Sequence, residues 1–186
     1  MAEQVASRRG LLFGALLLGA GVAVSLGVYG RVHDPAGFDA LPTFGFSSTG
    51  QFKSWMATVV LVLAVGQLVG ALWLYGKLPG KPAVPTWLGT AHRLSGALAF
   101  VLSLPVAYCC LYGLGFAPHT PRTSTLVHSV AGCTLYGAFA AKVLFVHSRR
   151  LPGWALPLAG GLLFTAIVVL WWTGAKWYWG VEGVSG

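Results

Sequence analysis

Five long apolar runs constrain the fold of this chain more than any other feature of its sequence. They lie at roughly residues 11–29, 54–78, 88–114, 124–147 and 154–179. A membrane-spanning helix needs about 20 consecutive, mostly apolar residues, and the runs lack the period-two alternation of a transmembrane β-barrel. Backbone groups in lipid must be hydrogen-bonded within the segment. The sequence therefore predicts an all-α integral membrane bundle of five transmembrane helices, forming a single domain over residues 1–186.

The composition and charge agree with a membrane protein. Hydrophobic residues make up 56% of the chain and charged residues only 9%, whereas a soluble domain is about 25% charged. The net charge of +8 comes from 12 Lys and Arg against 4 Asp and Glu. The basic residues stand mostly at the ends of apolar runs, where they contact lipid headgroups and set topology. We expect the lipid bilayer as partner and no nucleic acid, since no basic run forms a nucleic-acid patch.

The basic residues fall into two sets at opposite ends of the predicted spans. One set is Arg8, Arg9, Lys77, Lys81, Arg149 and Arg150, and the other is Arg31, Lys53, Arg122 and Lys176. Cytoplasmic loops carry an excess of Lys and Arg, so the larger set predicts an N-terminus inside and a C-terminus outside. The long loop 30–53 then lies outside, where its four phenylalanines either rest on the membrane surface, cap the bundle or dock a partner.

The N-terminal segment admits two interpretations. Ser7-Arg8-Arg9 before an apolar stretch is similar to a twin-arginine export signal. The stretch that follows is long enough to span, and no small-x-small cleavage site comes after it. We therefore interpret it as the first transmembrane helix.

Two of the predicted spans repeat the pattern His-x-x-x-Gly-x-x-x-aromatic. The third span has it at His92, Gly96 and Phe100, and the fourth at His128, Gly132 and Tyr136. Residues i and i+4 share a helix face, so each histidine has a glycine one turn further along on its own side. The glycine either allows close helix packing or leaves room for a flat group such as a porphyrin.

Each pattern extends into a stripe of small or polar residues. One stripe runs through His92, Gly96, Ala99, Ser103, Val106 and Cys110, and the other through His128, Gly132, Leu135, Phe139 and Lys142. At about 100° per residue the members of each stripe lie close to one line. We expect both stripes to face the protein interior rather than lipid.

The histidines are expected at different depths in the membrane. Their spans run antiparallel and each histidine is near the start of its span, which puts His92 and His128 roughly 20–25 Å apart. They cannot share one metal, so each needs a partner at its own level. His147 is available to His92, and the outer level of His128 offers Tyr108, Cys109, Cys110, His119 and His33. The sequence thus permits two b-type haem sites stacked across the membrane.

His147 and Lys142 each have an alternative explanation. His147 is about 100° from His128 around the helix and directly precedes Ser148-Arg149-Arg150, where an interfacial histidine needs no cofactor. Lys142 either extends to the cytoplasmic headgroups or faces inward. No Asp or Glu lies in any of the runs, so its anion would be a haem propionate, a quinone oxygen or a lipid phosphate. The missing carboxylates also argue against a proton pump, cation channel or ion-coupled transporter.

The segments HRLSG, HSVAG, AAKVL and LPGWALPLAGG resemble an uncharacterised family of small bacterial multi-spanning membrane proteins of high-GC Gram-positives. The layout of helices and histidines is similar to cytochrome b561-type and ferric-reductase-type membrane cytochromes, which hold haem b between helices through histidine pairs. This resemblance implies a multi-pass protein of the bacterial cell membrane with His92 and His128 as haem ligands. Where such a protein would offer an outer-level histidine on the third span, this chain has Cys109 and Cys110.

Two functions follow as alternatives. The first is a membrane b-type haem protein, with one or two haems, that passes electrons within or across the bilayer as part of a respiratory or redox system. Its cofactor-binding residues would be His92, His128, His147, Gly96, Gly132 and Lys142, with the three histidines as candidate iron ligands. Its partners would be a membrane or periplasm-side redox protein, a larger complex or a quinone. The second is a non-catalytic membrane subunit or assembly factor, whose histidines are structural and contribute about 1 kcal/mol each.

Overall fold

The chain is all-helical and forms two compact units in the computed structural model. The structure describes residues 2–37, 40–80, 82–116, 122–147 and 153–183, without the side chains of residues 2–9 and of His147. One unit comprises Met1–Asp34 and Gly115–Val169, and the other Pro35–Leu114 and Leu170–Gly186. The described residues include five helices long and apolar enough to cross a membrane. The predicted all-α class with five membrane-length helices is confirmed.

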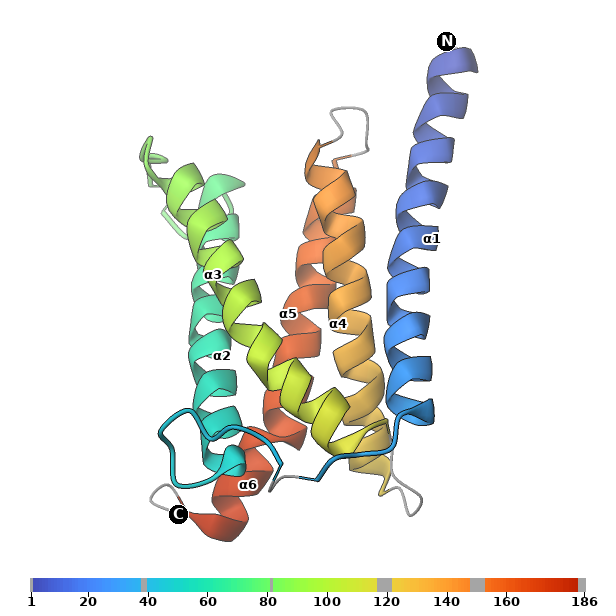
Figure 1. Ribbon diagram of the computed structural model, residues 1–186. Coiled ribbons are helices and arrows are strands. Elements are labelled where there is room, and N and C mark those ends of the chain that lie inside the picture. The colour runs from blue at the N-terminus through green and yellow to red at the C-terminus, as the bar shows by residue number, and fades with distance from the viewer. Residues whose placement is uncertain (1, 38–39, 81, 117–121, 148–152, 184–186) are drawn as a thin grey trace. The chain divides into compact units, whose positions relative to one another are not determined.

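Helices α1 (Ala2–Val32) and α4 (Thr123–His147) lie side by side in the first unit (Figure 1). Each presents a small residue, three others and a second small residue, at Gly19 and Ala23 and at Gly137 and Ala141. A Cβ built on Gly19 would lie 2.7 Å from the Gly137 carbonyl oxygen, and one on Gly137 would collide with the Gly19 carbonyl oxygen. The two backbones therefore touch, which is the contact that small residues permit between membrane helices.

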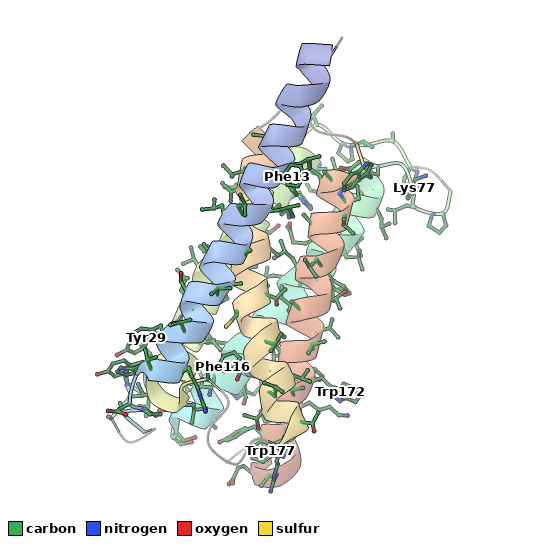
Figure 2. The ribbon with its side chains drawn as sticks, turned by 90° about the vertical axis from the view of Figure 1, so that its right-hand side faces the viewer. Phe13, Tyr29, Lys77, Phe116, Trp172 and Trp177 are labelled. Atoms are coloured by element: carbon green, nitrogen blue, oxygen red, sulfur yellow. The ribbon has the colours of Figure 1, made fainter. Side chains whose placement is uncertain are left out.

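The first unit also has an apolar core at one end of this helix pair. Ala15 of α1 and Phe145 of α4 pack there with Ala155 and Ala159 of α5 (Ala155–Thr173). Other large apolar side chains of α1 point outward, among them Phe13 and Tyr29 toward its opposite ends (Figure 2). Exposed apolar side chains along a helix of this length are those expected to face lipid.

Helix α2 spans Thr49–Leu74, whereas the predicted run is 54–78. The helix therefore begins several residues earlier than predicted, and it also ends several residues earlier. Ser48 caps its start, because its Oγ accepts a hydrogen bond from the Gln51 N–H at 3.1 Å while Gln51 Oε1 accepts from the Ser47 N–H at 3.0 Å. At its end Gly76 has φ of 63°, and the Lys77 N–H donates back to the Leu72 carbonyl at 2.8 Å. This left-handed glycine closes the helix although apolar residues continue beyond it.

The third span is a composite of α3 (Leu88–Tyr108) and the π-helix η1 (Cys109–Leu114), as predicted for residues 88–114. The long first loop docks on η1. The Ala36 N–H donates to the Tyr112 carbonyl and the Gly37 N–H to the Gly113 carbonyl, both at 3.1 Å. Leu41 packs directly on Gly113, where a Cβ would collide with its side chain. The loop caps the end of this span, one of the placements predicted for it.

The predicted last span, 154–179, is divided at Gly174 into α5 and α6 (Ala175–Glu182). Helix α6 packs on the start of α2, where the Ser48 Oγ and the Tyr178 hydroxyl lie 3.0 Å apart. Lys176 Nζ lies 3.2 Å from the centroid of the Trp172 ring, which is a cation–π contact.

In the second unit, Lys77 and two tryptophans of the last predicted span lie at opposite ends. Lys77 lies at one end and Trp172 and Trp177 at the other (Figure 2). This separation is what the predicted orientation requires, and the orientation itself stays a prediction. Of the basic residues on which it rests, Lys81, Arg149 and Arg150 lie outside the described residues, as do the side chains of Arg8 and Arg9.

Candidate functional site

The two histidine stripes are sheltered along their described length. On α3, Ala99 and Ser103 are buried, and on α4 Leu135 is buried. The remaining members are half-buried: His92, Gly96, Val106 and Cys110 on α3, and His128, Gly132, Phe139 and Lys142 on α4. The prediction that these stripes face inward agrees with this burial.

His92 is seated against a glycine of the neighbouring helix. Helices α2 and α3 pack together in the second unit (Figure 1). A Cβ built on Gly70 of α2 would lie 3.2 Å from His92 Nδ1, and no other atom comes as near to it. The missing side chain at position 70 therefore makes the space that the imidazole occupies.

Gln67, one turn from Gly70 on α2, holds the backbone beside His92. Its Nε2 donates to the His92 carbonyl oxygen at 2.8 Å and to Ser95 Oγ at 2.7 Å. Ser95 Oγ in turn donates to the Ala91 carbonyl oxygen at 2.7 Å. Both amide hydrogens and the hydroxyl are thus used to join α2 to the first turns of α3, where lipid offers no competing partner.

Gly96 accommodates the other end of the same carboxamide. A Cβ on Gly96 would lie 2.8 Å from Gln67 Oε1. Of the two explanations for the glycine after His92, this contact favours close helix packing, because the space beside Gly96 holds Gln67. We call Gln67, Gly70, His92, Ser95 and Gly96 the Gln67 cluster.

Gln67 was missed by sequence reasoning, which concentrated on histidines and glycines. A signal was present, because Gln67 is the one side-chain amide within the five predicted apolar runs. An amide in hydrocarbon must find a hydrogen-bond partner in the protein. The His-x-x-Ser-Gly segment of α3 supplies that partner, in a cluster without Asp, Glu, Lys or Arg.

His128, Gly132 and Lys142 lie on α4, in a different compact unit from His92 and Gly96. His33, one of the residues predicted at the outer level, is in the same unit as His128, and its ring stacks on Tyr29 with centroids 5.1 Å apart. His147 is the last residue of α4, and its side chain lies outside the described residues, as does all of His119.

The cysteines of the third span take part in packing. Cys109 is fully buried in a core with Leu41 and Phe52, and Cys110 is half-buried beside it. In the part of the chain that the structure describes, no group of three or more His, Cys, Asp or Glu could hold a metal ion. A centre with several protein ligands, such as a structural zinc site, is therefore not found among those residues.

Comparison with protein families gives a match over most of the chain, whereas no curated protein and no solved structure matches it. The family is described as a family of unknown function (DUF6529), and the match covers residues 12–186. The match includes the Gln67 cluster and the membrane-length helices, except for the first residues of α1. This chain of membrane-length helices therefore belongs to the DUF6529 family.

Proposed function

We propose that the protein is a membrane b-type haem protein that passes electrons within or across the bilayer, as part of a respiratory or redox system of the bacterial cell membrane. The observation that carries the proposal is the position of the His92 side chain between α2 and α3. Gln67 of α2 donates hydrogen bonds to the His92 carbonyl and to Ser95 of α3. It thus fixes the backbone beside His92, and the imidazole lies against Gly70 of α2, held in place as a ligand must be.

The position of the imidazole fits haem ligation. Nδ1 is the ring atom nearest Gly70, and the two ring nitrogens of an imidazole point in widely different directions. Nε2 is therefore the nitrogen that His92 would offer to iron. Because Gly96 is occupied by Gln67, a porphyrin at His92 would lie on another side of the helix than Gly96.

The other proposed haem-binding residues are on α4. His128 is half-buried inside an apolar span, and we propose that it would hold haem at a different membrane level from His92, with Gly132 beside it. His147 is a further candidate, at the level of His92. Lys142 is half-buried, and no Asp or Glu lies within the five apolar runs predicted from the sequence, so a haem propionate or a quinone oxygen is a suitable counter-ion.

Haem would supply reversible one-electron chemistry, and the chain would supply ligands, orientation and a medium without water. His92 and His128 both lie within helices long and apolar enough to cross a membrane. The electron donor and acceptor would be a membrane or periplasm-side redox protein, a larger complex or a quinone. A resemblance of the histidine layout to b561-type and ferric-reductase-type cytochromes is part of this proposal.

The test is the visible spectrum of the purified protein, oxidised and after reduction with dithionite. The expected result is a Soret band with sharp α and β bands on reduction, weakened or lost in His92→Ala and His128→Ala. Leu94→Ala and Val130→Ala are matched controls, because these exposed residues follow the histidines by two positions and face away from them. A folded, colourless wild-type protein from haem-replete cells would sink the proposal.

A non-catalytic membrane subunit or assembly factor is the second candidate, and the Gln67 cluster also favours it. Gln67, Ser95, Gly70 and Gly96 fit one another closely enough to serve helix packing alone. In that case His92→Ala would lower stability without any spectral change, and the protein would copurify with the other subunits of its complex.

A further inference from the structure

We infer that Gln67 is a positioning residue for His92: its carboxamide fixes the first turns of α3 and so sets the direction in which the imidazole points. The inference rests on the proposed function in one respect, since haem is the group for which that direction matters. Gln67 is tied directly to a histidine inside a span, because it bonds from the neighbouring helix to the backbone of His92 itself.

The hydrogen bonds restrain the segment on both sides of the imidazole. Gln67 holds the His92 carbonyl at 2.8 Å and Ser95 Oγ at 2.7 Å. Ser95 passes the restraint back to the Ala91 carbonyl at 2.7 Å. The residue before His92 and the turn after it are therefore linked to one amide on α2. Rotation or sliding of α3 relative to α2 would break these bonds together.

The orientation of the carboxamide follows from its surroundings. Its Oε1 lies against Gly96, at 2.8 Å from the place where a Cβ would stand. If the carboxamide of Gln67 were flipped, Oε1 would face the His92 carbonyl oxygen, and two hydrogen-bond acceptors would lie together. A glycine at position 96 leaves room for Oε1, which lies there when Nε2 faces His92.

The imidazole itself has little freedom on the α2 side. Nδ1 is within 3.2 Å of the place of a Cβ on Gly70, so any shift of α3 toward α2 presses the ring onto the α2 backbone. Gly70 sets how close the ring can come, and Gln67, three residues earlier, sets the height and rotation of α3. Groups that orient a metal ligand in this way commonly alter metal affinity about 10- to 100-fold.

Gln67→Met tests the inference, because methionine has similar length and no hydrogen-bond donor. Gln51→Met is the matched control: the same change in the same helix, about 24 Å away along its axis. In the haem-loaded full-length protein we expect Gln67→Met to weaken haem binding about tenfold or more and to shift the electron paramagnetic resonance g values of the oxidised haem. Gln51→Met should leave both unchanged. Gly96→Ala, whose Cβ would displace Oε1, should act in the same direction as Gln67→Met.

A haem-free measurement separates this inference from the proposed function. In the full-length protein prepared without haem and labelled with nitrogen-15 at histidine, we expect the His92 ring resonances to shift or broaden in Gln67→Met and in Gly96→Ala, but not in Gln51→Met. A wild-type protein that binds no haem overturns the proposed function alone, and the nitrogen resonances still decide this inference. His92 resonances unchanged in both cluster variants would overturn it, whether or not haem binds. If Gln67→Met fails to fold, Gly96→Ala decides.

Discussion

Single residues decide where the helices of this protein touch. In the first unit the Gly19 and Gly137 backbones meet, and in the second Gly70 and Gly96 receive the side chains of His92 and Gln67. Hydrophobic burial does not drive helices together in lipid, so close packing and interhelical hydrogen bonds must. The absence of a side chain at these positions is therefore a direct contribution to the fold.

Gly137→Ala should lower the free energy of unfolding by about 1–3 kcal/mol, because its Cβ would collide with the Gly19 carbonyl and strain the contact. Gly21→Ala is the control, since nothing lies within 4 Å of a Cβ at that position, and alanine should be neutral or stabilising there. Unfolding in mixed detergent micelles with increasing denaturing detergent measures both. Equal effects of the two substitutions would contradict the proposed backbone contact between α1 and α4.

The sequence predicted residues of the candidate site unevenly. The four-residue spacing of His92 and Gly96 marked the sheltered face of α3, because helix geometry alone relates residues i and i+4. The occupant of the space beside Gly96 depends on which residue of α2 stands opposite. That register comes from packing between helices, which periodicity within one span does not contain, so Gln67 was missed.

The ends of the helices depend on local capping interactions. Hydropathy locates only the central part of each helix. The core of α2 was predicted, but its start at Thr49 follows from the Ser48 cap and its end from the left-handed Gly76. The Ser-x-x-Gln pattern and the glycine were readable signals of both ends. The docking of the loop on η1 was not, because it joins residues about 75 positions apart in sequence, such as Ala36 and Tyr112.

Leu41→Ala should loosen that docking. Leu41 is buried against Gly113 and shares a core with Phe52 and Cys109, and truncating a buried leucine costs about 2 kcal/mol or more. If Leu41→Ala lowers the free energy of local opening of the loop by that amount, the Ala36 and Gly37 amides should exchange with solvent about 30-fold faster. Hydrogen–deuterium exchange measures this, with Thr43→Ala as control, because Thr43 is exposed although it lies in the same loop. Unchanged exchange at both amides would show that Leu41 does not hold the loop on η1.

At the scale of the whole molecule, the basic residues predict how the chain crosses the membrane. The described residues include five helices long and apolar enough to cross a membrane, and five crossings would place the termini on opposite sides. The excess of Lys and Arg at one set of ends predicts that the N-terminus is inside.

Fusions of reporter domains test this orientation. Alkaline phosphatase joined after residue 186 should be active and green fluorescent protein at the same place dark, because the C-terminus is predicted outside. The opposite pattern is expected for fusions in the loop at Lys77, which is predicted to be cytoplasmic. A fluorescent C-terminal fusion with inactive phosphatase there would reverse the orientation.

We propose that the histidines of the spans hold haem b, and the molar ratio of haem to purified protein is the direct test of this proposal. The full-length protein would be purified in mild detergent from haem-replete cells and its haem measured as the pyridine complex. We expect about one or two haem b molecules per chain, and fewer in the His92→Ala and His128→Ala variants. A folded wild-type protein with only trace haem, unchanged after incubation with added haem, would contradict it.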